Sequence, residues 1–373
     1  MIYFDNAATT KLNKEVLASF NKVNEKYFAN PASNHKLGLE VLSLEDTARN
    51  QIAKILNRTE SEIIFTSGAS EANNLAIKGT CLKYKNRGNH IITTKVEHPS
   101  VLNVFKQMHD LYNFDVTYLD VNQDGEVEIE TLKKAIKEDT ILVSIMSVNN
   151  EVGSINDIAA IGKLLKQYPK IIFHSDATQA MGKINLDYSD VDLVTMSAHK
   201  INGFKGSGLL LRKRNIDLVP LIDGGGQEFA LRSGTNNFPY EIALAKTLRI
   251  AFENLLTRYE YVSKIHDYMY EKLSCLDGVN INSPKNGSPY IINFSVNKKA
   301  SVVQEGLSLK EIYVSTKSAC SSKKKPYSYV IEAMGYDIER ATNAIRVSFS
   351  YENTMQEVDI FIEELQKVLK SIK

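Results

Sequence analysis

Short apolar runs alternate with helical patterns between about Ser61 and Leu211, and this rhythm constrains the fold more than any other feature of the chain. Seven such runs, most of them rich in β-branched residues, recur there: EIIFTSG, NHIITTKVEH, FDVTYLD, TILVSIMSV, KIIFHSDA, VDLVTMSAHK and GSGLLLRK. The alternation predicts an α/β domain with a largely parallel sheet. Several runs are apolar on successive residues, which indicates strands covered by helices on both faces.

The chain follows a different pattern after about Tyr240. Residues 240–274 carry apolar positions at helical spacing, which predicts a long helix or a helix pair leading out of the first domain. Beyond it, PYIINFSV, IYVST and NAIRVSFS are strand candidates, and MQEVDIFIEELQKVLKSI has the spacing of an amphipathic helix. We therefore expect an N-terminal segment at 1–15 that packs with a smaller α+β domain at 251–373, and a large domain at 16–250.

The balance of charges and the lack of long apolar runs limit the partners that this chain is expected to bind. Lys plus Arg (45) nearly balances Asp plus Glu (44), so no basic field favours direct nucleic-acid binding. The N-terminus has no targeting pattern and no run of about 18 apolar residues occurs, so we expect a cytoplasmic protein without membrane association.

The three cysteines are far apart and form no Cys-x-x-Cys pair, which disfavours a disulfide framework or a metal site. Cys81 and Cys275 fall in helical patterns, where we expect small buried or half-buried apolar residues. Cys320 instead lies in STKSACSSKKKPYSYV, among small polar residues and before three lysines. Positive charges favour the thiolate, which is the reactive form of a cysteine.

Lys200 comes just after an apolar run, in a segment that contains three glycines. Partial burial at the mouth of a sheet would lower the pKa of a lysine and allow its amine to form a Schiff base with an aldehyde cofactor. On composition alone, a lysine in a loop is usually a surface residue. Asp176 ends another apolar run, where it could pair with a protonated pyridine nitrogen, as pyridoxal enzymes require. A helix N-cap is the alternative for Asp176, and Gln179 could bond a cofactor phenolic oxygen.

Other polar residues suggest a phosphate site and a substrate site. The strand, Ser-Gly-Ala-Ser turn and helix of EIIFTSGASEANNLAIKG would offer free N–H groups to a phosphate at Ala69 and Ser70, although a simple helix cap has the same pattern. Ser197 and His199 converge from the lysine segment. His98 could stack on a pyridine ring and move protons, or could be only a hydrogen-bonded loop histidine.

Two further side chains are candidates for binding a substrate carboxylate. Asn150 follows the run ILVSIMSVN, and Arg346 lies in NAIRVSFS. The planar fork of an arginine binds a carboxylate through two hydrogen bonds.

Together, ten segments resemble the cysteine desulfurases of the NifS/IscS type, within the class V aminotransferase group of fold-type I pyridoxal phosphate enzymes. They are FDNAATT, NPASNHKLG, FTSGASEANNLAIKG, EHPSV, ILVSIMSVNNEVG, HSDATQAMGK, SAHKINGFKGSGLL, GGGQEFALRSGTNN, STKSACSS and AIRVSFS. The resemblance implies a large α/β domain with a mainly parallel seven-stranded sheet, followed by a smaller α+β domain.

The resemblance also implies a role for each site residue. Lys200 would form the Schiff base with pyridoxal 5'-phosphate, and Cys320 would receive sulfur from L-cysteine as a persulfide, with L-alanine as the other product. The cofactor would further contact Asp176, Gln179, His98, Ala69, Ser70, Ser197, His199 and Thr235. Thr235 would reach the site of the neighbouring subunit, which implies a homodimer. The substrate carboxylate would meet Arg346, Asn150 and Asn30.

The sulfur acceptor stays open at this point. The chain stops soon after its last expected helix, and its cysteine segment is more basic than the Gly-Ser-Ala-Cys-Thr-Ser version of the best-known members. An iron-sulfur scaffold and a tRNA-thiolation enzyme are both candidate acceptors. A selenocysteine lyase or another class V aminotransferase-type enzyme would use the same lysine and aspartate, and a sulfur carrier without catalysis is the non-enzymatic alternative.

Overall fold

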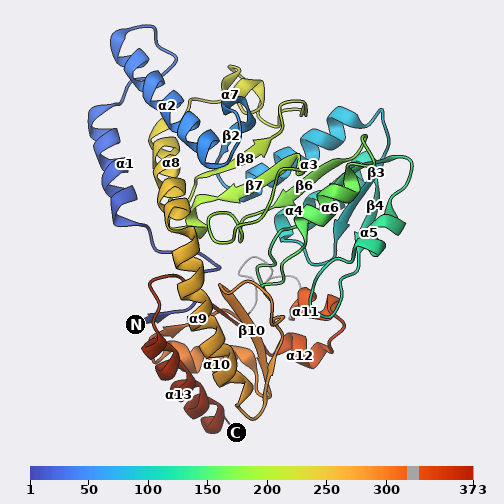
Figure 1. The fold of residues 1–373 in the computed structure, drawn as a ribbon, viewed down its shortest axis with the longest axis vertical. Helices are drawn as coiled ribbons and strands as arrows, with labels where there is room; N and C mark the ends of the chain where they lie inside the picture. The colour runs from blue at the N-terminus through green and yellow to red at the C-terminus, as the bar shows by residue number, and fades with distance from the viewer. Residues whose placement is uncertain (317–326, 373) are drawn as a thin grey trace.

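The computed structural model describes residues 1–316 and 327–372 (Figure 1). Its large sheet has the strand order β2-β8-β7-β6-β5-β3-β4. These strands are β2 (Ile63–Thr66), β3 (His90–Thr94), β4 (Asp115–Leu119), β5 (Thr140–Ser144), β6 (Ile172–Asp176), β7 (Leu193–Ser197) and β8 (Gly208–Arg212). Strand β8 runs in the opposite direction to the other six strands. All seven apolar runs are strands, and the prediction of a mainly parallel sheet is confirmed.

Helices cover both faces of this sheet, which explains why its strands are apolar on successive residues. Ile63 and Phe65 of β2 face a core shared with one set of helices, whereas Ile64 faces a second core. The first set is α2 (Lys36–Ile55), α5 (Ile129–Ala135), α6 (Ile158–Leu165) and α8 (Phe238–Glu253). The second set is α3 (Ala69–Tyr84) and α4 (Pro99–Tyr112).

A smaller antiparallel sheet has the order β12-β10-β9, with β9 (Val279–Ile281), β10 (Ile291–Val296) and β12 (Ala344–Ser348). Its core includes side chains of α9 (Leu255–Ser274), α10 (Ala300–Ser308) and α13 (Met355–Ser371). Near its start the chain also joins this region, because β1 (Ile2–Tyr3) pairs in parallel with β11 (Ile312–Tyr313). Both termini lie beside the small sheet in Figure 1.

The remaining elements are short or peripheral: α1 (Lys14–Lys26), α7 (Gln227–Ala230), α11 (Tyr329–Ala333), α12 (Ile338–Thr342) and the 3₁₀ turns Glu60–Glu62 and Ala198–Lys200. The helix pair expected over residues 240–274 is α8 and α9, which break at Asn254. The proposed domain boundaries at residues 15/16 and 250/251 stay predictions. None of the helices in the described parts of the chain has the length and apolar character needed to cross a membrane.

Two cysteines can be compared with their expected environments. Cys81 is fully buried in α3, as expected of a small apolar residue in a helical pattern. Cys275 is exposed, so the expectation that it is buried or half-buried is wrong. It caps the C-terminus of α9, where the buried stripe of that helix has already ended at Leu273.

Candidate active site

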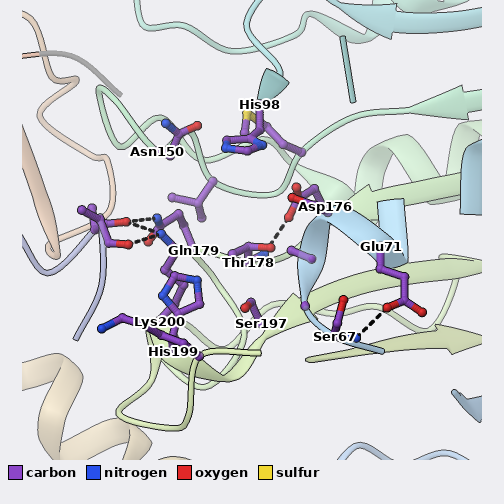
Figure 2. Close-up of a pocket in the computed structure, with 18 of the residues that line it drawn as sticks. Ser67, Glu71, His98, Asn150, Asp176, Thr178, Gln179, Ser197, His199 and Lys200 are labelled. Atoms are coloured by element: carbon purple, nitrogen blue, oxygen red, sulfur yellow. Dashed lines mark hydrogen bonds between the residues drawn. The ribbon is translucent and has the colours of Figure 1, made fainter. Parts of the chain in front are cut away.

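A cavity of about 420 Å³ opens at the carboxyl edge of the large sheet (Figure 2). Strands β2, β3, β6 and β7 all end at this edge, so the loops that follow them place their side chains around one space. Ten of the residues singled out from the sequence line the cavity: Ala69, Ser70, His98, Asn150, Asp176, Gln179, Ser197, His199, Lys200 and Arg346.

Lys200 stands in the 3₁₀ turn directly after β7. Its amine donates hydrogen bonds to the backbone oxygens of Ala7, at 2.6 Å, and Ala8, at 2.7 Å. The N-terminal segment is fixed over this turn, because the Thr10 hydroxyl donates to the backbone oxygen of His199 at 2.9 Å. The Lys200 amine is therefore held between the N-terminal segment and the turn that follows β7.

Asp176 ends β6 and is 4% exposed. One carboxylate oxygen accepts the backbone N–H of Thr178 at 3.0 Å, and the other accepts the side-chain amide of Asn73 at 2.8 Å. The same Asn73 nitrogen donates to the Ser100 hydroxyl, which lies 2.8 Å from Nδ1 of His98. Asn73, which the sequence reasoning missed, thus links the carboxylate to the imidazole at the start of α4.

Burial lowers the pKa of His98, and the nearby positive charge of Lys200 lowers it further, whereas Asp176 opposes both effects. His98 is therefore a neutral imidazole near pH 7. A neutral ring can stack on an aromatic heterocycle without placing a charge against it, and it can accept or release a proton.

The N-terminus of α3 offers donors to an anion. Its N-cap, Gly68, has φ of +143°, and no side chain caps the helix end. Ser70 and Ser197 line the cavity beside it. His199 lines the cavity too, and burial together with the lysines around it lowers its pKa to about 4. An uncapped 16-residue helix whose end adjoins two hydroxyls fits a phosphate group.

Arg346 reaches the cavity from β12 of the small sheet and is 3% exposed. Its guanidinium donates to the backbone oxygen of Asn150 at 2.8 Å and to the Asp5 carboxylate at 2.9 Å. Among the described residues, the arginine Nε and the Asn150 side-chain oxygen have no hydrogen-bond partner. A buried polar group without a partner is costly, so these atoms mark a place for a polar ligand.

Two predicted site residues do not line this cavity, and a third lies outside the described residues. Asn30 and Thr235 are exposed and do not line it. The Asn30 side-chain oxygen accepts the N–H of Ala32 at 2.9 Å, and Thr235 is expected to act in a neighbouring subunit. Cys320 lies outside the described residues. The roles of all three stay predictions.

Further cavity-lining residues were not picked out from the sequence, notably Ala7, Ala8, Glu71 and Lys205. The two alanines contribute backbone carbonyls, which leave no trace in side-chain chemistry. Glu71 pairs with Arg232 at 2.9 Å, so its charge is balanced next to the expected phosphate site.

Comparison with known proteins agrees with this arrangement. The family model for the class V aminotransferases matches residues 2–361. A NifS/IcsS protein homolog of Lactobacillus delbrueckii subsp. bulgaricus is 41% identical, over 99% of this chain and 97% of that protein. The cysteine desulfurase IscS of Colwellia psychrerythraea is 40% identical, over 100% and 93%. A solved NifS-like protein superposes with a TM-score of 0.92 at 36% identity, covering 99% of both chains. The chain therefore belongs to the class V aminotransferase family, among its pyridoxal phosphate-dependent cysteine desulfurases of the NifS/IscS type.

Proposed function

We propose that this enzyme converts L-cysteine to L-alanine and transfers the sulfur to Cys320 as a persulfide. The observation that carries the proposal is the meeting of the Lys200 amine, the Asp176 carboxylate and the Arg346 guanidinium around one cavity. They come from two different sheets, and each has a separate task in the handling of an amino acid by a pyridoxal enzyme.

The residues present fit the cofactor. Lys200 would hold its aldehyde, Asp176 its ring nitrogen, Gln179 its phenolic oxygen and His98 its ring face. The uncapped end of α3, with Ala69, Ser70, Ser197 and His199, would hold its phosphate. When bound, pyridoxal phosphate supplies an electron sink that makes the α-proton of an amino acid acidic.

The chain's own residues then position the substrate and move its protons. Arg346, with Asn150, binds the cysteine carboxylate. The Lys200 amine takes the α-proton, and the neutral His98 imidazole exchanges a proton with the substrate. The Cys320 thiolate attacks the substrate sulfur, so that a sulfur–sulfur bond forms and the carbon–sulfur bond breaks. The released carbon takes a proton and becomes the methyl group of alanine.

A homodimer and a protein acceptor complete the proposal. Large exposed apolar side chains on α1, on α2 and between them support a protein interface: Leu17, Phe28, Leu37, Leu39 and Leu42. In such a dimer Thr235 would reach the phosphate of the other subunit, and sedimentation would report the mass. A cytoplasmic location stays a prediction. The acceptor is an iron-sulfur scaffold or a tRNA-thiolation enzyme, and labelled cysteine with each purified acceptor distinguishes them.

The central test replaces Cys320 with Ser and uses Cys275→Ser as its matched control, since Cys275 is an exposed cysteine in the described part of the chain. Cys320→Ser should abolish alanine and sulfide formation, while the absorption band of the bound cofactor at about 400 nm remains. Cys275→Ser should keep both. Cysteine turnover that survives in Cys320→Ser would contradict the proposal.

Two further measurements separate the alternatives. Lys200→Ala should lose the absorption band, and a wild-type protein without a band in excess cofactor would favour a non-enzymatic sulfur carrier. A selenocysteine lyase would turn over selenocysteine but not cysteine, and another aminotransferase-type enzyme would act without Cys320.

A further inference from the structure

Lys183 is a buried lysine that the proposed mechanism does not use. It follows β6, is 6% exposed and forms no ion pair with a carboxylate in the described parts of the chain. Its amine donates to the side-chain oxygen of Gln179 at 3.0 Å and lies 5.5 Å from the centre of the Tyr290 ring. Burial lowers its pKa to about 7, aided by the charges of Lys200 and Arg346. An amine buried at such cost needs an explanation.

The hydrogen bonds of Gln179 explain why the Lys183 amine is buried. Its oxygen accepts from Lys183, and its nitrogen donates to the backbone oxygen of Ala7 at 3.0 Å. The same Ala7 oxygen accepts from the Lys200 amine at 2.6 Å. Three hydrogen bonds therefore connect the buried amine to the cofactor lysine through one amide and one carbonyl.

An amide side chain has an acceptor end and a donor end, and the two are exchanged by a flip. A protonated lysine has donors and no acceptor, so in this state Lys183 selects the orientation with the Gln179 oxygen facing it. A neutral amine also donates but has a lone pair, and the Ala7 carbonyl, which can only accept, then favours the same orientation. The nitrogen then has one N–H for Ala7 and one for the cavity, which Gln179 lines. Lys183 does not line the cavity, and its hydrogen bond to the site is the one that it donates to Gln179.

We infer that Lys183 is a positioning residue that fixes the Gln179 amide with its nitrogen toward the phenolic oxygen of the cofactor. This inference rests on the proposed cofactor site. A flipped amide would turn its oxygen toward both the phenolic oxygen and the Ala7 carbonyl, where two acceptors repel each other.

The test is a double-mutant cycle of Lys183→Met and Gln179→Leu, with binding of pyridoxal phosphate as the readout. Methionine has nearly the length of lysine but no donor. Lys183→Met should weaken cofactor affinity by about threefold to tenfold, the range expected for one hydrogen bond. It should also shift the absorption maximum of the bound cofactor in the same direction as Gln179→Leu does. In the Gln179→Leu background, Lys183→Met should change neither quantity.

Additive effects of the two substitutions, or a single Lys183→Met variant with wild-type affinity and absorption maximum, would overturn the inference. The cofactor-free variant should unfold at a urea concentration equal to or above that of the wild type, because an apolar side chain replaces an amine without a carboxylate partner. Should Lys183→Met not fold, Lys183→Leu enters the same cycle with the same two decisive outcomes.

Failure of the inference can be told apart from failure of the proposed function. The proposed function fails if the wild type binds no cofactor or if Lys200→Ala keeps the absorption band. The inference fails when the wild type binds the cofactor through Lys200 and the cycle shows no coupling between Lys183 and Gln179.

Discussion

Gly208→Ala should damage the phosphate end of the site through packing alone. A Cβ at Gly208 would lie 2.6 Å from Cα of Gly68 and 2.6 Å from the backbone oxygen of Met196. Both atoms are backbone, so neither can move away by a change of rotamer. Overpacking of this kind costs about 1–3 kcal/mol. Since Gly68 is the N-cap of α3, relief of the clash would displace the helix end that we expect to hold the phosphate.

Two assays measure the two consequences. Urea unfolding of the cofactor-free protein should give a free energy of unfolding lower by about 2 kcal/mol at an unchanged m-value. Cofactor affinity should fall by about fivefold or more, which corresponds to the loss of roughly 1 kcal/mol of helix-terminus interaction.

Gly335→Ala is the matched control. Gly335 has φ of +89°, and no atom lies within 4 Å of the position of its Cβ. Its substitution should cost only the left-handed backbone strain of about 1–2 kcal/mol and leave cofactor affinity unchanged. The reasoning is refuted if Gly208→Ala binds pyridoxal phosphate as tightly as Gly335→Ala does.

Three other predictions follow from buried charges. Arg346→Lys should raise KM for cysteine by about tenfold or more, measured by alanine formation, because an ammonium cannot reproduce the planar fork. His199 has a pKa lowered from 6.5 to about 4 by burial first and by neighbouring lysines, so its contribution to stability is complete above pH 6.5 and is lost as pH falls toward 4. His199→Gln should therefore show a shallower loss of urea stability in acid. Burial and neighbouring carboxylates raise the pKa of Glu241 from 4.5 to about 9, so its contribution is complete below pH 4.5 and is lost as pH rises through 9. Glu241→Gln should unfold at higher urea than the wild type at pH 8, and this advantage should vanish at pH 4.

The placement of the cavity could be predicted because its main residues follow apolar strands. Asp176 ends β6 and Lys200 follows β7, and parallel strands bring their carboxyl ends to one edge. The direction of β8 could not be predicted in the same way, since LLL between two buried faces reads alike in either direction. Its antiparallel course follows from the short connection after Lys200, which leaves no room for a crossover helix.

Other parts of the site could not be predicted from the local amino-acid sequence. The acceptors for Lys200 are backbone carbonyls of two alanines, and any residue carries such a carbonyl. Asn73 lies in a helix at a position that reads as an ordinary polar residue, and only the tertiary fold brings it to Asp176, 103 residues away. The exposure of Cys275 depends on where the buried stripe of α9 ends, and helix ends are less certain from a sequence than helix interiors.

One short segment, residues 5–8, connects the two halves of the site. Asp5 accepts from Arg346 of the small sheet, and Ala7 and Ala8 accept from Lys200 beside the large sheet. The Lys200 amine and the Arg346 guanidinium are thus held by neighbouring residues of one turn, although the two residues are 146 positions apart along the chain. Because Asp5 already accepts one N–H of the guanidinium, a cysteine carboxylate bound as we propose would share Arg346 with it. The five N–H donors of an arginine allow this, since Asn150 and Asp5 each take one of them. Nε, which has no partner among the described residues, is one of the donors left for the substrate.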